Sequence, residues 1–266
     1  MIADKLLQKG IYWNRTWSLV DGCTPISEGC QHDWLAGIYW RFKEKSDYKD
    51  LAILKNGIPT CSGIIRFRED RFNVPLKIKK PQVFAIWSDL FHEIVSHEFI
   101  IYAFGVMKTA KQHTFLILTK RPQRIEKMLY KWNFDKELYL LSNVFFGITV
   151  ENQQRAHERI PYLLQVPGKR FISFEPLLSN IDFRVVFWGM NLDFSKVEIN
   201  QIIVGAESGP HRRFCNVEWI RSVVRQCKEA NIPCFVKQIH DSKGKIIKDI
   251  NLFPEDIKVR ELAWNK

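Results

Sequence analysis

From residue 81 onward, short apolar runs alternate with amphipathic stretches at nearly regular intervals. The runs are rich in β-branched and aromatic residues, and they cover residues 81–89, 113–120, 143–151, 169–176, 201–208 and 233–239. Continuous apolar runs are typical of strands that are buried on both faces of a parallel sheet. The stretches between most of them have helical periodicity, at residues 92–110, 121–132, 152–165 and 216–231. This alternation predicts a parallel α/β architecture.

The spacing of these runs favours a barrel over an open dinucleotide-binding sheet. The run ends recur roughly every 30 residues, the length of one βα unit. No glycine-rich dinucleotide loop follows any run, which argues against a Rossmann fold. The segment at residues 16–22 can supply one further strand. We therefore predict a single domain, residues 1–266, that forms a full or partial (β/α) barrel with helices outside. An irregular insertion is expected at about residues 38–80, and its role, as lid or substrate clamp, stays open.

Polar side chains follow the predicted strands, where barrel enzymes carry their chemistry. Charges beside apolar strand ends are costly unless they are paired or used. We predict catalytic roles for Lys120, Glu175, Glu207 and Lys237. Predicted cofactor-binding positions are Ser88, Asp89, Thr119, Glu151, Gly205 and Ser208. The alternative for each polar residue is a helix cap or a solvated loop, since Ser, Asp and Asn are favoured at helix N-termini.

The charge balance predicts a polyanionic partner. The net charge is +11 and the isoelectric point is about 9.4, which favours nucleic acid or a nucleotide as partner. The basic residues cluster at 64–80, and aromatic residues are interleaved with basic ones at 11–17 and 38–43. Aromatic rings can stack on unpaired bases while cations meet phosphates. The alternative is a basic composition without a function.

The remaining composition is that of an ordinary globular protein. Hydrophobic residues make up 46% and charged residues 26% of the chain. No apolar run reaches the roughly 18 residues that a membrane span needs, and no signal-peptide pattern opens the sequence. We expect a cytoplasmic protein with no membrane partner.

A loop near the N-terminus carries a ligand-like spacing. Cys23, Cys30 and Asp33 are spaced C-x6-C-x2-D, with His32 beside the last position. In a reducing compartment, clustered cysteines are more often ligands or catalytic groups than disulfides. The loop is a metal site with Asp33 as third ligand, a site that has lost its metal, or only a turn. A further alternative is a structural zinc knuckle that includes His32 but lacks the usual C-x2-C pair. The other cysteines are expected to be inert thiols; they are Cys61, Cys215, Cys227 and Cys234.

Seven segments, in the same order along the chain, resemble a family of phage and prophage proteins. The segments are WSLVDGCTPISEGCQHDW, WSDLFHE, HTFLILTKRP, VFFGITVENQ, RFISFEPLL, IIVGAESGP and PCFVKQ. The resemblance covers roughly residues 11–240. That family is built around a C-x6-C-x2-C motif and is similar to radical S-adenosylmethionine (SAM) enzymes, with a distant similarity to spore photoproduct lyase.

The resemblance implies a radical-SAM-type barrel with a [4Fe–4S] cluster and SAM as cofactors. Cys23 and Cys30 match two cluster ligands, and Asp33 stands at the place of the third cysteine. The glycine–glutamate segment that usually binds the methionine amino group is absent, and Ser88 and Asp89 stand there instead. The implied function is a radical-SAM-like iron–sulfur enzyme acting on a nucleic acid or nucleotide. The alternative is a catalytically silent barrel that binds nucleic acid or a partner protein without a cluster.

Overall fold

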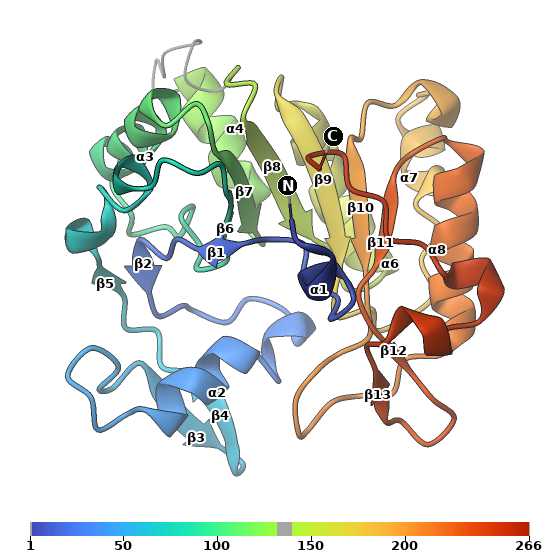
Figure 1. The fold of residues 1–266 in the computed structure, drawn as a ribbon, viewed down its shortest axis with the longest axis horizontal. Coiled ribbons are helices and arrows are strands. Elements are labelled where there is room, and N and C mark those ends of the chain that lie inside the picture. The colour runs from blue at the N-terminus through green and yellow to red at the C-terminus, as the bar shows by residue number, and fades with distance from the viewer. Residues whose placement is uncertain (1, 132–139, 266) are drawn as a thin grey trace.

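A seven-stranded parallel sheet, curled as a half-barrel, forms the centre of the computed structural model, which describes residues 2–131 and 140–265 (Figure 1). Its order is β1-β6-β7-β8-β9-β10-β11, so each strand after the first pair lies beside its neighbour in sequence. The strands are β1 (Arg15–Thr16), β6 (Val83–Ile86), β7 (Thr114–Thr119), β8 (Val144–Thr149), β9 (Lys169–Phe174), β10 (Gln201–Val204) and β11 (Cys234–Val236). All neighbouring pairs in this order are parallel, as the continuous apolar runs predicted.

Helices follow the strands and flank the sheet. They are α3 (His97–Thr109), α4 (Pro122–Lys131), α6 (Gln153–Leu164), α7 (Arg184–Gly189) and α8 (Val217–Glu229). Three of them begin at a polar cap: the side chains of Ser96, Asn152 and Asn216 accept hydrogen bonds from backbone N–H groups of the first turn. The result is a mixed α/β fold of the partial (β/α)-barrel kind. Within the described residues, no helix has the length and apolar character needed to span a bilayer.

Two boundaries differ from the sequence-based prediction. Residues 16–22 do not form one strand of the sheet: only Thr16 belongs to it, and Val20–Asp21 form β2, which pairs antiparallel with β5 (Arg66–Phe67). The helix predicted at 92–110 begins later, at His97, because Ser96 caps it and the preceding residues form turns. Residue 132, the end of another predicted helix, lies outside the described residues.

Two small lobes flank one end of the sheet (Figure 1). The first overlaps the insertion predicted at about residues 38–80 but begins earlier, with α2 (Trp34–Arg41). It also contains the antiparallel pair β3 (Ala52–Lys55) and β4 (Ile58–Cys61). It has its own buried cluster, made of Ala36, Tyr39, Leu51, Ala52 and Cys61. The second lobe contains the antiparallel pair β12 (Ile239–His240) and β13 (Ile246–Ile247).

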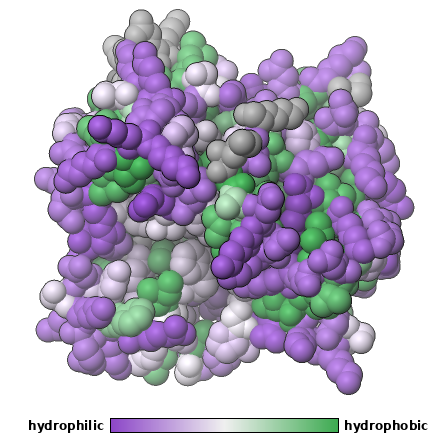
Figure 2. All heavy atoms as spheres, viewed as in Figure 1, coloured by the Kyte–Doolittle hydropathy of each residue, from purple (hydrophilic) through white to green (hydrophobic). Residues whose placement is uncertain are grey.

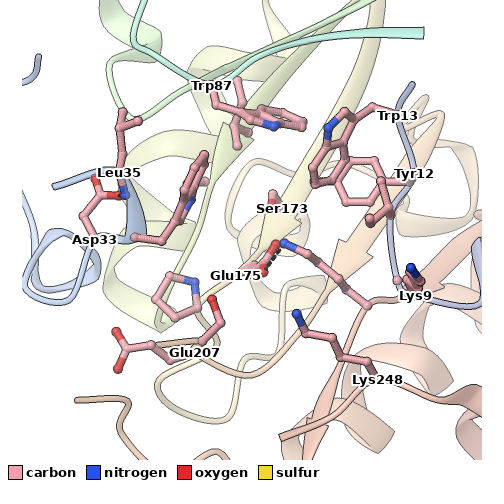
Figure 3. Close-up of a pocket in the computed structure, with 18 of the residues that line it drawn as sticks. Lys9, Tyr12, Trp13, Asp33, Leu35, Trp87, Ser173, Glu175, Glu207 and Lys248 are labelled. Carbon is pink, nitrogen blue, oxygen red and sulfur yellow. Dashed lines mark hydrogen bonds and ion pairs between the residues drawn. The ribbon is translucent and has the colours of Figure 1, made fainter. Parts of the chain in front are cut away.

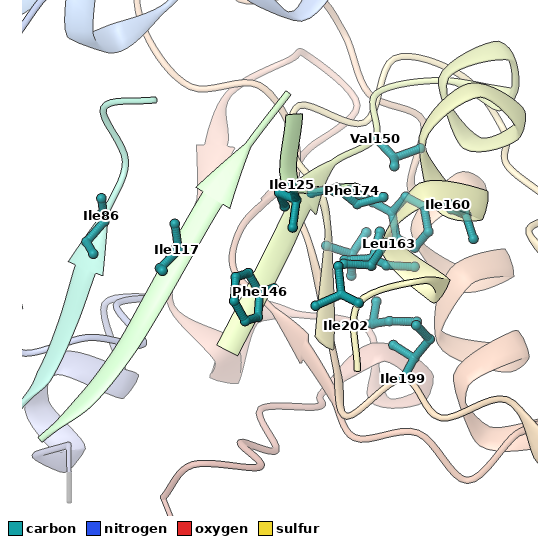
Figure 4. Close-up of a cluster of buried hydrophobic side chains, with 14 of the residues drawn as sticks. Ile86, Ile117, Ile125, Phe146, Val150, Ile160, Leu163, Phe174, Ile199 and Ile202 are labelled. Atoms are coloured by element: carbon teal, nitrogen blue, oxygen red, sulfur yellow. The ribbon is translucent and has the colours of Figure 1, made fainter. Parts of the chain in front are cut away.

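The outer face of the sheet carries the larger apolar core. Side chains alternate along each strand, so Phe115 and Ile117 of β7 belong to this core, whereas Leu116 points to the other face. Figure 4 shows Ile117 and Phe146 on the strands, with Ile125 of α4 and Leu163 of α6 in the same cluster. Burial of this face by the helices gives the sheet its main hydrophobic stabilisation.

The inner face is filled by aromatic and aliphatic side chains near the middle of the strands. These are Leu116, Phe145, Phe171, Ile203 and Phe235, with Tyr12 and Trp264 from the two ends of the chain. We call this set the aromatic plug. The short helix α1 (Asp4–Leu7) packs against it through Leu6 and Leu7. The C-terminal segment pairs with β11, since Val236 N donates to Val259 O at 2.9 Å and Glu261 N donates to Cys234 O at 2.9 Å.

The aromatic plug requires a glycine at position 147. A Cβ at Gly147 would lie 2.1 Å from Cζ of Phe171, its neighbour across the β8–β9 ladder. We expect Gly147→Ala to lower the free energy of unfolding by about 1–3 kcal/mol, because a tightly packed interior tolerates an added methyl group poorly. Gly105→Ala in α3 is the control: open space surrounds that position, and alanine should stabilise the helix by about 0.5–1 kcal/mol. Chemical denaturation of both variants measures the difference, and equal stabilities would contradict the packing.

Candidate functional site

A cavity of about 860 Å³ lies at the carboxyl ends of the strands. Parallel strands bring these ends to one edge of a sheet, and the residues that follow five of the strands line the cavity. These residues are Trp87, Lys120, Glu175, Glu207 and Lys237. The four residues predicted to be catalytic are therefore brought together, although their roles stay a prediction. Figure 2 shows the face hollowed between the two halves of the molecule.

Tryptophan side chains form much of the cavity wall (Figure 3). Trp13 and Trp87 pack edge to face, with ring centroids 5.2 Å apart and an interplanar angle of 84°, directly beside the aromatic plug. Trp34, the first residue of α2, lines another part of the cavity and is 49% exposed. Three tryptophan rings thus line the cavity, and the ring of Trp34 is half exposed to solvent.

Charged groups of both signs line the same cavity, but they differ in how they are paired. The Lys237 ammonium donates to Glu175 Oε1 at 2.6 Å, and Gln238 Nε2 donates to the same oxygen at 2.8 Å. The ammonium groups of Lys9, Lys120 and Lys248, in contrast, form no hydrogen bond or ion pair within the described ranges. Three positive charges are therefore free to meet an anion in the cavity.

Glu207 is buried and ties two loops together. His32 Nδ1 donates to Glu207 Oε2 at 3.0 Å, and the backbone N–H and Nε of Arg213 donate to the same oxygen at 2.7 and 3.0 Å. Burial raises the pKa of Glu207, but the hydrogen bonds from Arg213 and His32 more than offset it, so the pKa is lower than usual. The carboxylate thus stays ionised and holds the loop at residues 28–33 against the loop after β10.

Lys120 lies where the cysteine loop meets the sheet. Burial by itself lowers the pKa of its ammonium, and the acidic groups around it raise this pKa above its ordinary value. Those groups are Cys30, Asp33, Glu151 and Cys23. Lys120 therefore remains a cation at the border of the cavity and is close to all three positions of the C-x6-C-x2-D motif.

Several predicted cofactor-binding residues have partners inside the protein instead. Asp89 accepts from Arg121 Nη1 at 2.8 Å and from Thr119 Oγ1 at 2.6 Å. Glu151 is fully buried and accepts from Arg159 Nη1 at 2.8 Å. These pairs fix the strand ends, and none of the three predicted positions (Asp89, Thr119 and Glu151) lines the main cavity.

The other three predicted positions are distributed differently. Ser208 lines the main cavity, whereas Gly205 is buried beside the amide of Gln238, with 3.0 Å from an ideal Cβ to Nε2. Ser88 lines a smaller neighbouring cavity of about 340 Å³. Its buried hydroxyl has no hydrogen-bond partner in the part of the chain that the structure describes. Of the six predicted cofactor-binding positions, Ser208 is thus the one that lines the main cavity.

The cysteine loop does not fit a three-thiolate cluster as it stands. Burial raises the pKa of the Cys23 thiol to about 12, and Cys23 packs against the small core of the insertion lobe. The Cys30 Sγ is 3.8 Å from Ser27 Oγ, and Asp33 Oδ1 accepts from Leu35 N at 2.8 Å as the cap of α2. Over residues 2–131 and 140–265, no three His, Cys, Asp or Glu side chains are grouped so as to hold a metal ion. All six cysteines are free thiols.

Sequence reasoning missed several residues that line the cavity. Trp34 and Trp87 gave no separate signal, although Trp87 directly precedes the Ser-Asp pair that was chosen. Lys248 belongs to a region without any motif, and only the fold brings it to the cavity. The aromatic segment at 11–17 contains Trp13, which lines the cavity, and its expected stacking on nucleic-acid bases stays a prediction.

The lowered pKa of Glu207 predicts a pH-dependent contribution to stability. The ionised carboxylate stabilises the fold above the unfolded-state pKa of 4.5, and this contribution is lost as the pH falls through the lower folded-state pKa. We expect Glu207→Gln to be less stable than the wild type at neutral pH, with a difference in unfolding free energy that shrinks below pH 4.5. The control is Glu69→Gln, which replaces an exposed carboxylate and should change the unfolding free energy by less than about 0.5 kcal/mol. A constant difference for Glu207→Gln would contradict the assignment.

Comparisons with known proteins place most of the chain, including the cavity, in one family. Residues 8–251 match the family model described as "Protein of unknown function (DUF5131)". No curated protein and no solved structure matches the chain. The matched range includes the cysteine loop, all seven strands of the sheet and the residues of both lobes that line the cavity.

Proposed function

The chain belongs to the family described as proteins of unknown function (DUF5131), and we propose that its cavity binds a nucleotide, free or as an unpaired unit of a nucleic acid. The observation that carries this proposal is the combination of tryptophan walls with three unpaired ammonium groups in one cavity. A nucleotide has one flat aromatic part and one anionic part, and the cavity offers a complement to each. We also propose a cytoplasmic location, where such ligands occur.

The aromatic part of the ligand would be held by stacking. Trp34 is half exposed at the mouth of the cavity, and Trp13 and Trp87 present ring surfaces further in. Stacking of a base on an aromatic side chain contributes about 1–3 kcal/mol and tolerates any base. A volume of about 860 Å³ is in the range of cavities that enclose a small organic ligand.

The anionic part of the ligand would be held by lysine. Lys120 is half-buried, so a phosphate that reaches it meets a cation in a medium of lowered dielectric, where the attraction is stronger than in water. Lys9 and Lys248 are exposed and lie on the rim. They would add long-range attraction, in keeping with the net charge of +11.

Binding of thymidine monophosphate and of a single-stranded oligonucleotide tests the proposal. Trp34→Ala should raise the Kd of both by about 5-fold or more, the equivalent of 1 kcal/mol or more of lost stacking. Lys120→Gln should weaken the nucleotide but leave the uncharged nucleoside unchanged. The control is Trp188→Ala on α7, a tryptophan that is 56% exposed and does not line the cavity. Equal affinities for Trp34→Ala and Trp188→Ala would remove the cavity as the binding site.

Radical-SAM chemistry is the second candidate, and it rests on the resemblance and on one observation. Cys23, Cys30 and Asp33 all lie close enough to Lys120 to raise its pKa, so the cysteine loop does reach the carboxyl edge of the sheet, as a radical-SAM-type barrel requires. With a third thiolate this loop would have the donor set of a [4Fe–4S] cluster. The carboxylate of Asp33 is a harder donor than a thiolate and suits such a cluster less well.

Restoring the third thiolate separates the two candidates. After anaerobic reconstitution, we expect about four irons and matching sulfide in Asp33→Cys and little iron in the wild type. Asp33→Ser keeps a helix-capping side chain without a thiol and is the control for the loss of the carboxylate. Four irons in the wild type would make Asp33 a working ligand and would favour the enzyme. If the wild type, Asp33→Cys and Asp33→Ser all bind no iron, nucleotide binding is the one candidate function that remains.

A further inference from the structure

A second, strongly basic depression lies beside the main cavity, between the first halves of α4 and α6. Its volume is about 240 Å³. Six cationic side chains and two carboxylates line it, together with Ile26 and Gln123; the charged residues are Glu93, Lys120, Arg121, Arg124, Lys127, Arg155, Glu158 and Arg159. We call this depression the basic groove. It was not predicted from the sequence, where the basic segment at 64–80 was the signal.

Some of these cations are structural. Arg121 binds Asp89 and the Thr24 carbonyl oxygen, the latter at 2.9 Å, and Arg159 binds Glu151. These guanidinium groups are buried, and their partners hold them in place. They contribute to the positive potential of the basic groove, but replacing them would disturb the fold.

Two further cations, Lys127 and Arg155, are not tied to buried carboxylates. Lys127 is exposed, and its ammonium forms no hydrogen bond or ion pair within the described residues. Arg155 pairs with Glu158 one turn along α6, but its Nε is buried without a hydrogen-bond partner in the described part of the chain. An anion in the basic groove would give both side chains a partner. Phosphate oxygens suit a guanidinium and an ammonium side by side.

The basic groove and the main cavity share one lining residue. Lys120 lines both, so an anion bound to it would lie at the border between the two. A chain of phosphates that passes Lys120 could therefore leave the main cavity and run along Lys127 and Arg155. The single phosphate of a mononucleotide that binds Lys120 cannot also reach Lys127 and Arg155. A nucleic-acid strand has one phosphate for each nucleotide, so its further phosphates can.

We propose that the basic groove binds the backbone phosphates of a single-stranded nucleic acid, one nucleotide of which occupies the main cavity. This inference rests on the proposed function, because it extends the same ligand beyond the cavity. The proposed ligand is therefore a single strand of nucleic acid and not a free nucleotide. The three unpaired cavity lysines and the basic groove then form one positively charged path at the carboxyl edge of the sheet.

The experiment compares a labelled oligo(dT) of about ten nucleotides, a length within the usual site sizes, with thymidine monophosphate. The test variant is Lys127→Gln with Arg155→Gln. The matched control, Arg225→Gln with Lys228→Gln, removes two exposed positive charges from α8, away from both cavities. Kd is measured over a range of salt concentrations. Circular dichroism checks that both variants stay folded.

We expect the test variant to bind oligo(dT) at least about tenfold more weakly at low salt, with the slope of log K against log salt reduced by about 1.4. This is the loss of two contacts at about 0.7 each on a single strand. The control should change the affinity less than about twofold. Thymidine monophosphate should bind the test variant as it binds the wild type.

The outcomes separate this inference from the proposed function. If Trp34→Ala weakens thymidine monophosphate but the test variant and the control bind oligo(dT) equally, phosphate binding by the basic groove is overturned. Nucleotide binding by the main cavity is then supported. If Trp34→Ala has no effect while the test variant loses oligo(dT), the groove stands and the cavity proposal fails. If an oligoglutamate of matched charge binds as tightly, with the same sensitivity to the test variant, nucleic acid is overturned as the partner.

Discussion

The stacking of Phe171 over Gly147 divides the half-barrel into a filled part and an open part. The absence of a side chain at position 147 lets the phenyl ring lie flat on β8, where Phe145 and Trp264 close around it. Trp264 in turn donates from Nε1 to the Tyr12 carbonyl oxygen at 3.2 Å, which ties the two ends of the chain into the same cluster. Because this aromatic plug ends at the middle of the strands, the carboxyl ends above it are free to line a cavity.

At the carboxyl ends of the strands, the charged side chains are of two kinds, those with a carboxylate partner and those without one. Arg121 and Arg159 are buried with carboxylate partners, and breaking such a pair typically costs about 3–5 kcal/mol because it strands a charge in the interior. Lys120 follows the same strand as Arg121 but has no such partner in the described residues. Two neighbouring residues thus differ: carboxylate partners hold the Arg121 guanidinium in place, whereas the Lys120 ammonium has no ion-pair partner in the described residues.

The sequence predicts the strands and the place of the cavity, but not which of the charged side chains are paired. The apolar runs identify six of the seven parallel strands, β6 to β11, because burial on both faces leaves a continuous apolar pattern in each strand. The short strand β1 (Arg15–Thr16) has no such run and was placed wrongly at residues 16–22. The place of the cavity follows, since parallel strands end together. The sequence does not show which charges are paired. Glu151 and Glu207 both follow a strand, but their partners come from different elements. Arg159 of α6 pairs with Glu151, and Arg213 of the loop after β10 pairs with Glu207. Trp34 and Lys248 reach the cavity from the two lobes, and that contact exists only in the folded chain.

Contacts within the protein hold the cysteine loop in place. Many metal loops are ordered by the ion itself, so a lost ligand would leave them without structure. Here protein contacts hold the loop: Arg121 and Arg213 donate to the carbonyl oxygens of Thr24 and Glu28 at 2.9 and 3.0 Å. Asn152 adds two hydrogen bonds of 3.1 Å to the Glu28 carboxylate. With these contacts in place, the loop can border the cavity whether or not position 33 is a cysteine.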